Sequence, residues 1–226
     1  MRHVLDRPAW SALTGRHAAL AEGGERARRY DPAIVPFAAA RDDTPESIAA
    51  LASLPRGDEG LVFLQAGPVP LPDGLVAEIE ADGVQMSAAV PLPRIADPRI
   101  ARLGPEDAAD MLELALLTKP GPFTLRAQAL GPFWGIRIDG RLAAMAGTRM
   151  RMEGHTELSG VCTHPELRGR GLGTLMSRFV AGEIAATGDI AFLHAFASNR
   201  AAIDLYAGLG FTLRSEMSIR FVRRRG

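Results

Sequence analysis

Hydrophobic positions in the second half of the chain follow the periods of a strand, a helix and a further strand. Between Gly171 and Thr187 the apolar residues recur at spacings of about 3, 4, 7, 8 and 12, which predicts a helix with one apolar face. Ile190 to Phe196 is a nearly continuous apolar run, as expected of a strand that is covered on both faces. With a strand over Thr156 to Thr163, this order predicts two parallel strands joined by a right-handed crossover.

The flanking pattern predicts more strands and helices of an α/β fold. Phe133 to Ile138 and Arg141 to Met152 are strand-like and are separated by Asp139-Gly140, a hairpin signal. Together with the strand at Thr156 they predict three successive antiparallel strands. A helix is expected from Pro105, another from Asn199 to Gly208, and a last strand from Phe211.

The first half of the chain predicts α/β elements without a catalytic pattern. Helices are expected over Pro8 to Leu20 and from Pro45 to about Leu54, and strands over Gly60 to Gln65 and Val84 to Val90. Prolines at 91, 93 and 98 mark a linker. We therefore expect an N-terminal α/β domain of unknown role over residues 1–95 and a second domain over residues 96–226.

Composition and charge narrow the classes of protein that fit. The chain has 226 residues, 47% of them hydrophobic, and its 26 basic and 26 acidic residues give a net charge of zero, which argues against a nucleic-acid-binding role. The basic run Arg223 to Arg225 is expected to be a solvated terminus. The single cysteine excludes a disulfide framework and a cysteine-built zinc site. Without a signal-like start or an apolar run of about 18 residues, we expect a cytoplasmic protein with no membrane partner and no metal.

The densest chemical signal lies between the Thr156 strand and the following helix. The segment Arg168, Gly169, Arg170, Gly171, Leu172, Gly173 and Thr174 has glycine at alternate positions. Such a loop lets backbone approach a ligand, and free amides at a helix N-terminus favour an anion such as pyrophosphate. A Walker loop is excluded because the segment has no lysine, and a dinucleotide loop because the glycine spacing differs and Asp189 precedes its strand.

Two motifs resemble those of the GNAT superfamily of N-acetyltransferases. Val161-Cys162-Thr163-His164-Pro165, followed by the glycine loop, is similar to its acyl-CoA signature, and Ser198 to Tyr206, ending in Gly210-Phe211, is similar to its second motif. The resemblance covers about residues 97 to 226. The segment Glu157 to Pro165 resembles the branch related to glycine N-acyltransferases.

The resemblance implies a GNAT acyl-CoA N-acyltransferase fold, a mixed and mostly antiparallel sheet whose central parallel strands splay apart. It also implies that acetyl-CoA is the cosubstrate, with its pyrophosphate on the amides of residues 168–174 and its pantetheine arm paired to the strand at Val161, Cys162 and Thr163. Asn199 would contact pantetheine, and Tyr206 would protonate the departing thiolate. Asn199 and Tyr206 are seven residues apart, so they share one face of their helix. Asn199 as a helix cap, and Tyr206 as a packed aromatic, are the structural alternatives.

Removal of a proton from the acceptor amine calls for a base near the thioester. Glu157 precedes Val161 by four residues, so its side chain points to the same face unless a bulge intervenes. It matches a position where related proteins carry a glutamate base, although an exposed strand glutamate fits the pattern equally. His164 is more typical of a turn residue, and Cys162 of a small core residue.

These observations predict direct acyl transfer from acetyl-CoA to a primary amine of a small metabolite or peptide, in a ternary complex. The alternative is a non-catalytic acyl-CoA-binding module. The acceptor is expected near residues 116–130, where Phe123 and Trp134 either line the site or pack in the core. The first 95 residues, which have no glycine loop, could be a degenerate copy of the same fold, and a homodimer is left open.

Overall fold

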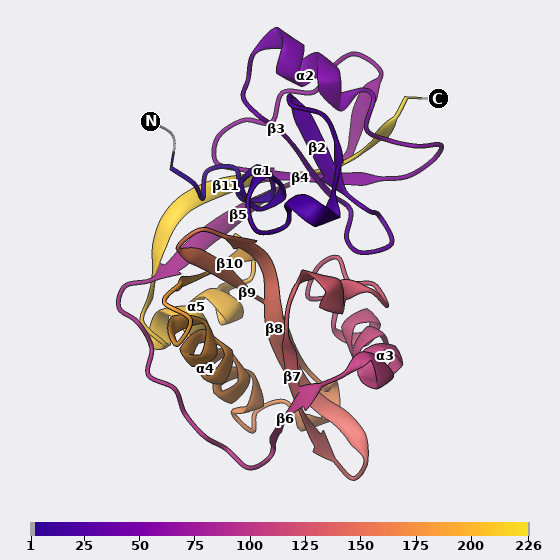
Figure 1. Cartoon of the computed structure of the whole chain (residues 1–226). Helices are drawn as coiled ribbons and strands as arrows, with labels where there is room; N and C mark the ends of the chain where they lie inside the picture. Colours follow the sequence, from indigo (N-terminus) through magenta and orange to yellow (C-terminus); the bar gives the residue numbers. More distant parts are fainter. Residues whose placement is uncertain (1–2, 226) are drawn as a thin grey trace.

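The computed structural model describes residues 3–225 and builds them around one continuous mixed sheet (Figure 1). Its strands follow the order β1-β2-β3-β4-β11-β5-β10-β9-β8-β7-β6. The strands are β1 (Ala21–Gly23), β2 (Ala27–Tyr30), β3 (Phe37–Ala40), β4 (Leu61–Gln65), β5 (Leu75–Ala88), β6 (Ile100–Leu103), β7 (Phe133–Ile138), β8 (Arg141–Met152), β9 (His155–Thr163), β10 (Ile190–Phe196) and β11 (Phe211–Arg224).

Five α-helices in residues 3–225 cover the sheet. They are α1 (Pro8–Thr14), α2 (Pro45–Leu51), α3 (Ala108–Thr118), α4 (Leu172–Ala185) and α5 (Arg200–Gly208). In the C-terminal half, α3 and α4 lie on opposite sides of β8 and β9 (Figure 1). Separate apolar clusters fill the two sides: Met111 and Leu114 of α3 pack with Cys162, whereas Met176 and Val180 of α4 pack with Leu158.

The predicted strand, helix and strand unit is confirmed. β9 and β10 are parallel and are joined through α4, and β7, β8 and β9 form the expected antiparallel series. The turn between β7 and β8 places Asp139 at φ 50° and Gly140 at φ 79°, as the Asp-Gly signal requires. The mixed, mostly antiparallel sheet that the sequence predicts is confirmed, with parallel pairing of β9 with β10 and of β3 with β4.

The N-terminal half differs more from its sequence expectations. The first helix ends at Thr14, where Gly15 follows, and strands β1, β2 and β3 were not predicted. β5 starts at Leu75 instead of Val84. Its first half, from Leu75 to Asp82, pairs with the C-terminal part of β11, from Ser218 to Arg224, and so continues the strand that was expected at Val84. Arg223 and Arg224 belong to this same long pair, and the run Arg223 to Arg225 is exposed, so the basic run is a solvated end as expected, formed largely by the last strand.

β5 and β11 connect the two halves. Each is 14 residues long, and they pair antiparallel over almost their whole length. β5 comes before the expected boundary at residue 95, yet it lies between β10 and β11, so the sheet is continuous across that boundary. The proline-rich linker packs across α4, where the Pro93 carbonyl lies close to Gly182 and Arg94 pairs with Glu183 at 2.6 Å. The division into two domains stays a prediction.

The sheet has a repeated connection on either side of β5 and β11. β3, α2 and β4 form a parallel strand-helix-strand unit, as β9, α4 and β10 do, and the two units lie at equivalent places in the strand order. This arrangement is the one expected if the N-terminal half is a second copy of the fold that exchanges its last strand with the first copy.

Candidate functional site

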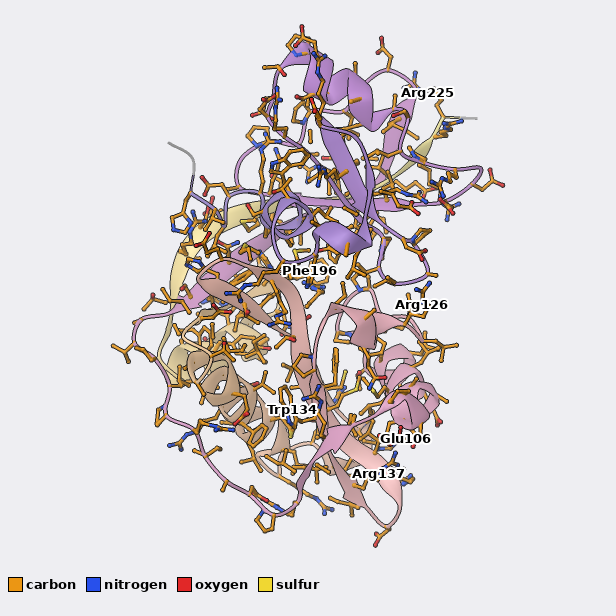
Figure 2. The ribbon with its side chains drawn as sticks, in the orientation of Figure 1. Glu106, Arg126, Trp134, Arg137, Phe196 and Arg225 are labelled. Carbon is orange, nitrogen blue, oxygen red and sulfur yellow. The ribbon has the colours of Figure 1, made fainter. Side chains whose placement is uncertain are left out.

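A cleft opens where β9 and β10 separate. Their parallel pairing covers only the start of each strand and ends at Glu157 and Phe192. Beyond that point a cavity of about 170 Å³ is bounded by residues of both strands and of α5. Among its lining residues are Arg149, Leu158, Ser159, Gly160, Val161, His194, Ala195, Phe196, Asn199 and Tyr206. Phe196, at the end of β10, lies at the level where the two halves of the molecule meet (Figure 2).

A β-bulge shapes the β9 side of this cleft. Gly160 has φ +62°, and the register with β8 shifts between the pairs Met145↔Cys162 and Gly147↔Ser159. A Cβ atom at Gly160 would lie 2.7 Å from the Phe133 ring, so the position also needs glycine for space. The extra residue reverses the alternation of side chains along the strand.

The bulge corrects the expected direction of Glu157. Leu158 and Val161 pack in the same cluster beneath α4, although they are three positions apart, an odd spacing that would place them on opposite faces of a regular strand. Because neighbours in a strand alternate, Glu157 points to the face opposite Leu158 and therefore opposite Val161. The condition attached to the sequence prediction is thus met: a bulge intervenes, and Glu157 and Val161 do not share a face.

Glu157 is fully buried in a network of charges. Arg149 donates two hydrogen bonds to its carboxylate at 2.6 and 2.9 Å, and the Met150 amide donates a third at 3.1 Å. His194 Nδ1 lies 2.7 Å from Glu157 Oε1. Burial alone would raise the pKa of Glu157, but Arg149 and His194 outweigh it and hold that pKa well below its usual range. The carboxylate is ionised and paired.

The network continues into the N-terminal half through Gln85 of β5. Arg214 donates to Gln85 Oε1 at 2.8 Å, and Gln85 Nε2 donates to the Leu5 carbonyl at 2.9 Å. Because arginine only donates and a carbonyl only accepts, the orientation of the Gln85 amide is fixed. Gln85 Nε2 also lies 2.9 Å from His194 Nε2, which must therefore accept. The remaining proton of a neutral His194 is on Nδ1, facing Glu157.

Tyr206 and Asn199 lie together at the cleft, as their spacing predicts. The Asn199 side chain also caps α5 by accepting from the Ala202 amide at 3.2 Å, so its structural role as a helix cap is confirmed. The Tyr206 ring packs edge-on against Phe211 with centroids 6.1 Å apart. Burial raises the pKa of Tyr206 to about 12, so the phenol keeps its proton at neutral pH.

The glycine loop forms an open cradle at the start of α4. Gly169 and Gly171 have φ 76° and 74°, and a Cβ atom at either would meet nothing within 4 Å. Arg168, Gly169, Arg170, Gly171 and Thr174 are exposed, whereas Leu172 is buried beneath the helix. Within residues 3–225, no acceptor receives the N–H groups of residues 169–171. Free amides at a helix N-terminus suit an anion.

The strand residues before the loop divide between the two faces. Val161 lines the cleft, and Thr163 ends β9 beside Gly173. Cys162 is 2% exposed and packs with the α3 cluster, so it is the small core residue that the sequence favoured. Burial raises the pKa of its thiol to about 12, so the thiol stays protonated at neutral pH. Trp134 packs against Phe179 with ring centroids 5.7 Å apart. Phe123 does not line the cleft itself but lines a larger cavity that adjoins it.

Sequence reasoning missed Arg149, His194 and Gln85. Arg149 follows Thr148 and shares the end of β8 with Arg151, so its charge alone did not single it out; the structure places its guanidinium carbon 4.7 Å from the centroid of the Phe37 ring. His194 interrupts an apolar run, which is a usable signal. Gln85 has no comparable signal, because its strand reaches the site only through pairing with β10.

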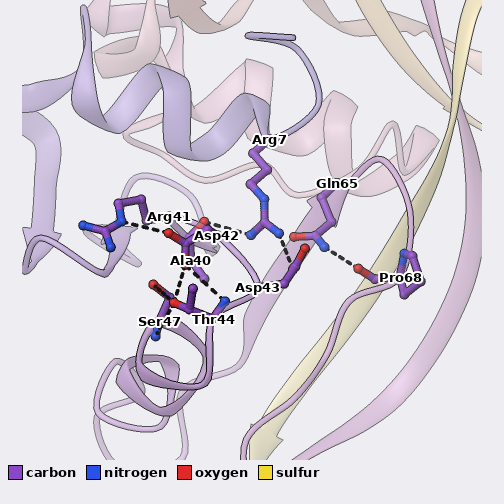
Figure 3. Close-up of polar contacts among 9 residues, drawn as sticks. All are labelled: Arg7, Ala40, Arg41, Asp42, Asp43, Thr44, Ser47, Gln65 and Pro68. Atoms are coloured by element: carbon purple, nitrogen blue, oxygen red, sulfur yellow. Dashed lines mark hydrogen bonds and ion pairs between the residues drawn. The ribbon is translucent and has the colours of Figure 1, made fainter. Parts of the chain in front are cut away.

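The equivalent position in the N-terminal half is closed to an anion. In place of glycines, the segment between β3 and α2 contains Asp42 and Asp43 (Figure 3). Hydrogen bonds from Ser47 and Thr44 hold the pKa of Asp42 well below its usual range. Arg7 donates to the Ala40 carbonyl at 3.0 Å and pairs with Asp43, so a side chain of the protein occupies the strand end. Two carboxylates thus stand where the other half has glycines, and their negative charge disfavours an anion at this strand end.

Residues 3–225 contain no cluster of three or more histidine, cysteine, aspartate or glutamate side chains that is placed to hold a metal ion. No helix of the described chain has the length and apolarity needed to cross a membrane.

Comparison with known proteins decides the family. Over the full length of both chains, the protein is 44% identical to a GNAT-family protein of known crystal structure from Novosphingobium aromaticivorans, with a TM-score of 0.94. The chain belongs to the GNAT family. The family model described as FR47-like protein matches residues 134–220, which include the β9 bulge, the glycine loop and α5.

Two more distant GNAT structures share the fold. A GCN5-related N-acetyltransferase from Kribbella flavida is 16% identical with a TM-score of 0.66, and the match covers all of this chain and 97% of that one. A GNAT-family acetyltransferase from Colwellia psychrerythraea is 13% identical with a TM-score of 0.53, over 89% of this chain and 82% of that one. No curated protein matches the sequence. The full-length match to the Kribbella protein shows that the GNAT fold here includes the N-terminal half.

Proposed function

We propose that this GNAT protein transfers an acetyl group from acetyl-CoA to a primary amine of a small metabolite or peptide. One arrangement carries the proposal: the parallel strands β9 and β10 separate after Glu157 and Phe192, and β9 leads into an open glycine loop with free amides at the start of α4. In the GNAT fold this arrangement serves acyl transfer from acyl-CoA. The glycine N-acyltransferase-like branch, a cytoplasmic location, the absence of nucleic-acid and membrane partners, and a homodimer remain predictions.

Acetyl-CoA would lie along the C-terminal half of the sheet. The amides of residues 168–174 are the proposed contacts of the pyrophosphate, with Gly169 and Gly171 leaving room for it. The main chain at Val161, Cys162 and Thr163 would pair with the pantetheine arm in the manner of an added strand. Asn199, exposed beside the cleft, is the proposed side-chain contact of that arm.

The reaction proposed is direct attack within a ternary complex. The neutral amine nitrogen forms a bond to the thioester carbonyl carbon, and the carbon–sulfur bond breaks. Tyr206 donates its phenolic proton to the departing thiolate, a role supported by its place at the cleft and its raised pKa. The proton that the acceptor ammonium loses before attack passes to water.

Glu157 as the base that removes this proton remains a prediction. Its burial and its pairing with Arg149 and His194 favour a positioning role instead. Both of those partners line the cleft, so Glu157 would act by holding them there. The bulge supports the same role, because it turns Glu157 away from the face on which Val161 lies.

Acetyl-CoA titration of matched glycine variants tests the cosubstrate site. Gly171→Ala and Gly188→Ala both place alanine at a positive φ, 74° and 85°, with no atom within 4 Å of the new Cβ. Each should cost about 1 kcal/mol of stability. Only Gly171→Ala should weaken acetyl-CoA binding in calorimetry, because only this Cβ enters the cradle. Equal affinities in the two variants would contradict the pyrophosphate site.

Release of CoA in the presence of an amine panel separates the enzyme from a non-catalytic acyl-CoA-binding module. The enzyme should release CoA only when an acceptor is present. Tight binding of acetyl-CoA without turnover of any amine would favour the binding module.

A further inference from the structure

A second, larger cavity continues from the cleft toward the N-terminal half. Its volume is about 540 Å³, within the range of small-molecule sites. It shares lining residues with the cleft, namely Val62, Lys119, Gly121, Pro122 and Phe221. A molecule whose reacting group lies in the cleft can therefore extend into this outer groove.

The walls of the outer groove are mainly apolar and come from both halves of the chain. Leu61 and Val62 of β4 and Phe221 and Val222 of β11 form one side, and Leu116 of α3 the other. Leu116 is 66% exposed, and Ile79 of β5 is 55% exposed. Exposed apolar side chains around one groove favour an apolar occupant.

The charges at the groove leave one positive charge uncompensated at its junction with the cleft. At the outer groove Glu78 pairs with Arg223 at 3.0 Å, and in the cleft Arg149 is neutralised by Glu157. Lys119 is the only lysine of the sequence, and no carboxylate within residues 3–225 lies within 4 Å of its ammonium group. It ends α3 with φ 51°, and it lines both cavities.

We propose that the acceptor is an amine with a carboxylate next to the nitrogen and a large apolar side chain, as in an apolar α-amino acid. The amine would lie in the cleft, the carboxylate at Lys119 and the apolar side chain in the outer groove. Lys119 is then a specificity residue, because an ammonium that meets a carboxylate makes a charge-assisted hydrogen bond. This inference rests on the proposed acetyltransferase function and names its substrate class.

Two probes that differ in the carboxylate test the assignment: L-phenylalanine and 2-phenylethylamine. We expect the wild type to prefer phenylalanine in kcat/KM. In Lys119→Gln the ratio of the two kcat/KM values should fall by roughly 10-fold, the lower range for a hydrogen bond to a charged group. Lys119→Arg keeps the charge and should retain most of the preference. A ratio that does not change in Lys119→Gln would overturn the inference.

Binding of the product provides a second readout that does not need turnover. N-acetyl-L-phenylalanine should bind the wild type in the presence of CoA and bind Lys119→Gln roughly 10-fold more weakly. If the protein binds acetyl-CoA but neither acetylates phenylalanine nor binds this product, the proposed substrate class is overturned and the proposed acetyltransferase function is not. Failure to bind acetyl-CoA would instead contradict the proposed function.

The outer groove itself is tested with Leu116→Glu. A carboxylate there should repel the carboxylate of phenylalanine and make the groove less apolar around its ring, so the KM for phenylalanine should rise. The variant should stay folded, and its mass measured by light scattering should not change. A change of oligomeric state in Leu116→Glu, with the KM unaffected, would show that the groove is a contact between two copies of the chain and would overturn the proposal.

Discussion

His194 Nδ1 lies 2.7 Å from Glu157 Oε1, which joins the cleft between β9 and β10 to a buried carboxylate. The same carboxylate binds Arg149, and His194 Nε2 meets Gln85 at 2.9 Å. These contacts cross adjacent strands from β8 to β5. One side of the cleft is therefore held by a strand that comes from the N-terminal half.

The hydrogen bond from Gln85 to His194 should be visible at the histidine ring. In the wild type, histidine nitrogen-15 spectra should show the ring proton on Nδ1, because Nε2 accepts from the Gln85 amide. In Gln85→Leu the donor is lost, so the nitrogen-15 shift of Nε2 should move toward that of a ring nitrogen that accepts no hydrogen bond. An Nε2 shift that keeps its wild-type value in Gln85→Leu would show that the amide does not bind this ring.

Loss of the Glu157 charge should destabilise the protein strongly. Glu157→Gln leaves Arg149 buried beside Phe37 without its counter-charge, which should cost about 3–5 kcal/mol in urea unfolding. The matched control is Glu183→Gln, which breaks an exposed ion pair with Arg94 and should cost less than about 1 kcal/mol. Similar costs for the two variants would mean that the buried network contributes little.

A positioning role of Glu157 in catalysis has its own readout. If Glu157 were the direct base, Glu157→Gln would remove the low-pH limb of the profile of kcat/KM against pH. If it holds Arg149 and His194, the rate falls but the acceptor's own ammonium still gives a limb that rises with pH. The folded fraction of the variant at each pH serves as the control.

Tyr206→Phe should lower kcat by about 10²-fold with little effect on acetyl-CoA binding. The phenyl ring keeps the contact with Phe211, so the change removes the hydroxyl and leaves the packing. Stopped assays of CoA release measure the rate, and calorimetry measures the affinity. A wild-type rate in Tyr206→Phe would show that water protonates the leaving thiolate.

His17 should make the stability of the fold depend on pH. Its ring is buried beside the Tyr30 hydroxyl at 3.0 Å, and burial lowers its pKa from 6.5 to about 4. Between these values the unfolded chain binds a proton that the folded chain does not, so stability decreases as the pH falls through this window. The loss should approach about 3 kcal/mol at pH 4. In His17→Gln this part of the pH dependence should disappear from urea unfolding curves.

The sequence was sufficient for elements whose signals are local. The apolar face of α4, the unbroken run of β10 and the Asp139-Gly140 turn predict their own structures, because the periodicity or the backbone freedom resides in those residues. β5 was predicted only in part. Its segment from Ala77 to Asp82 alternates apolar and acidic residues, a strand signal that our prediction did not include, and its pairing with β11 joins it to the Val84 segment as one strand.

The sequence by itself determined the strand-loop-helix motif at residues 161–174, the shared face of Asn199 and Tyr206, and the resemblance that leads to GNAT. Only the tertiary structure decided on which face of β9 the Glu157 side chain lies. The extra residue at Gly160 reverses the alternation of side chains along this strand, and no local sequence pattern indicates that bulge. Tertiary structure also brought Gln85 to His194 and Lys119 to the edge of the cleft. These neighbours are distant in sequence, and strand pairing or packing alone places them together.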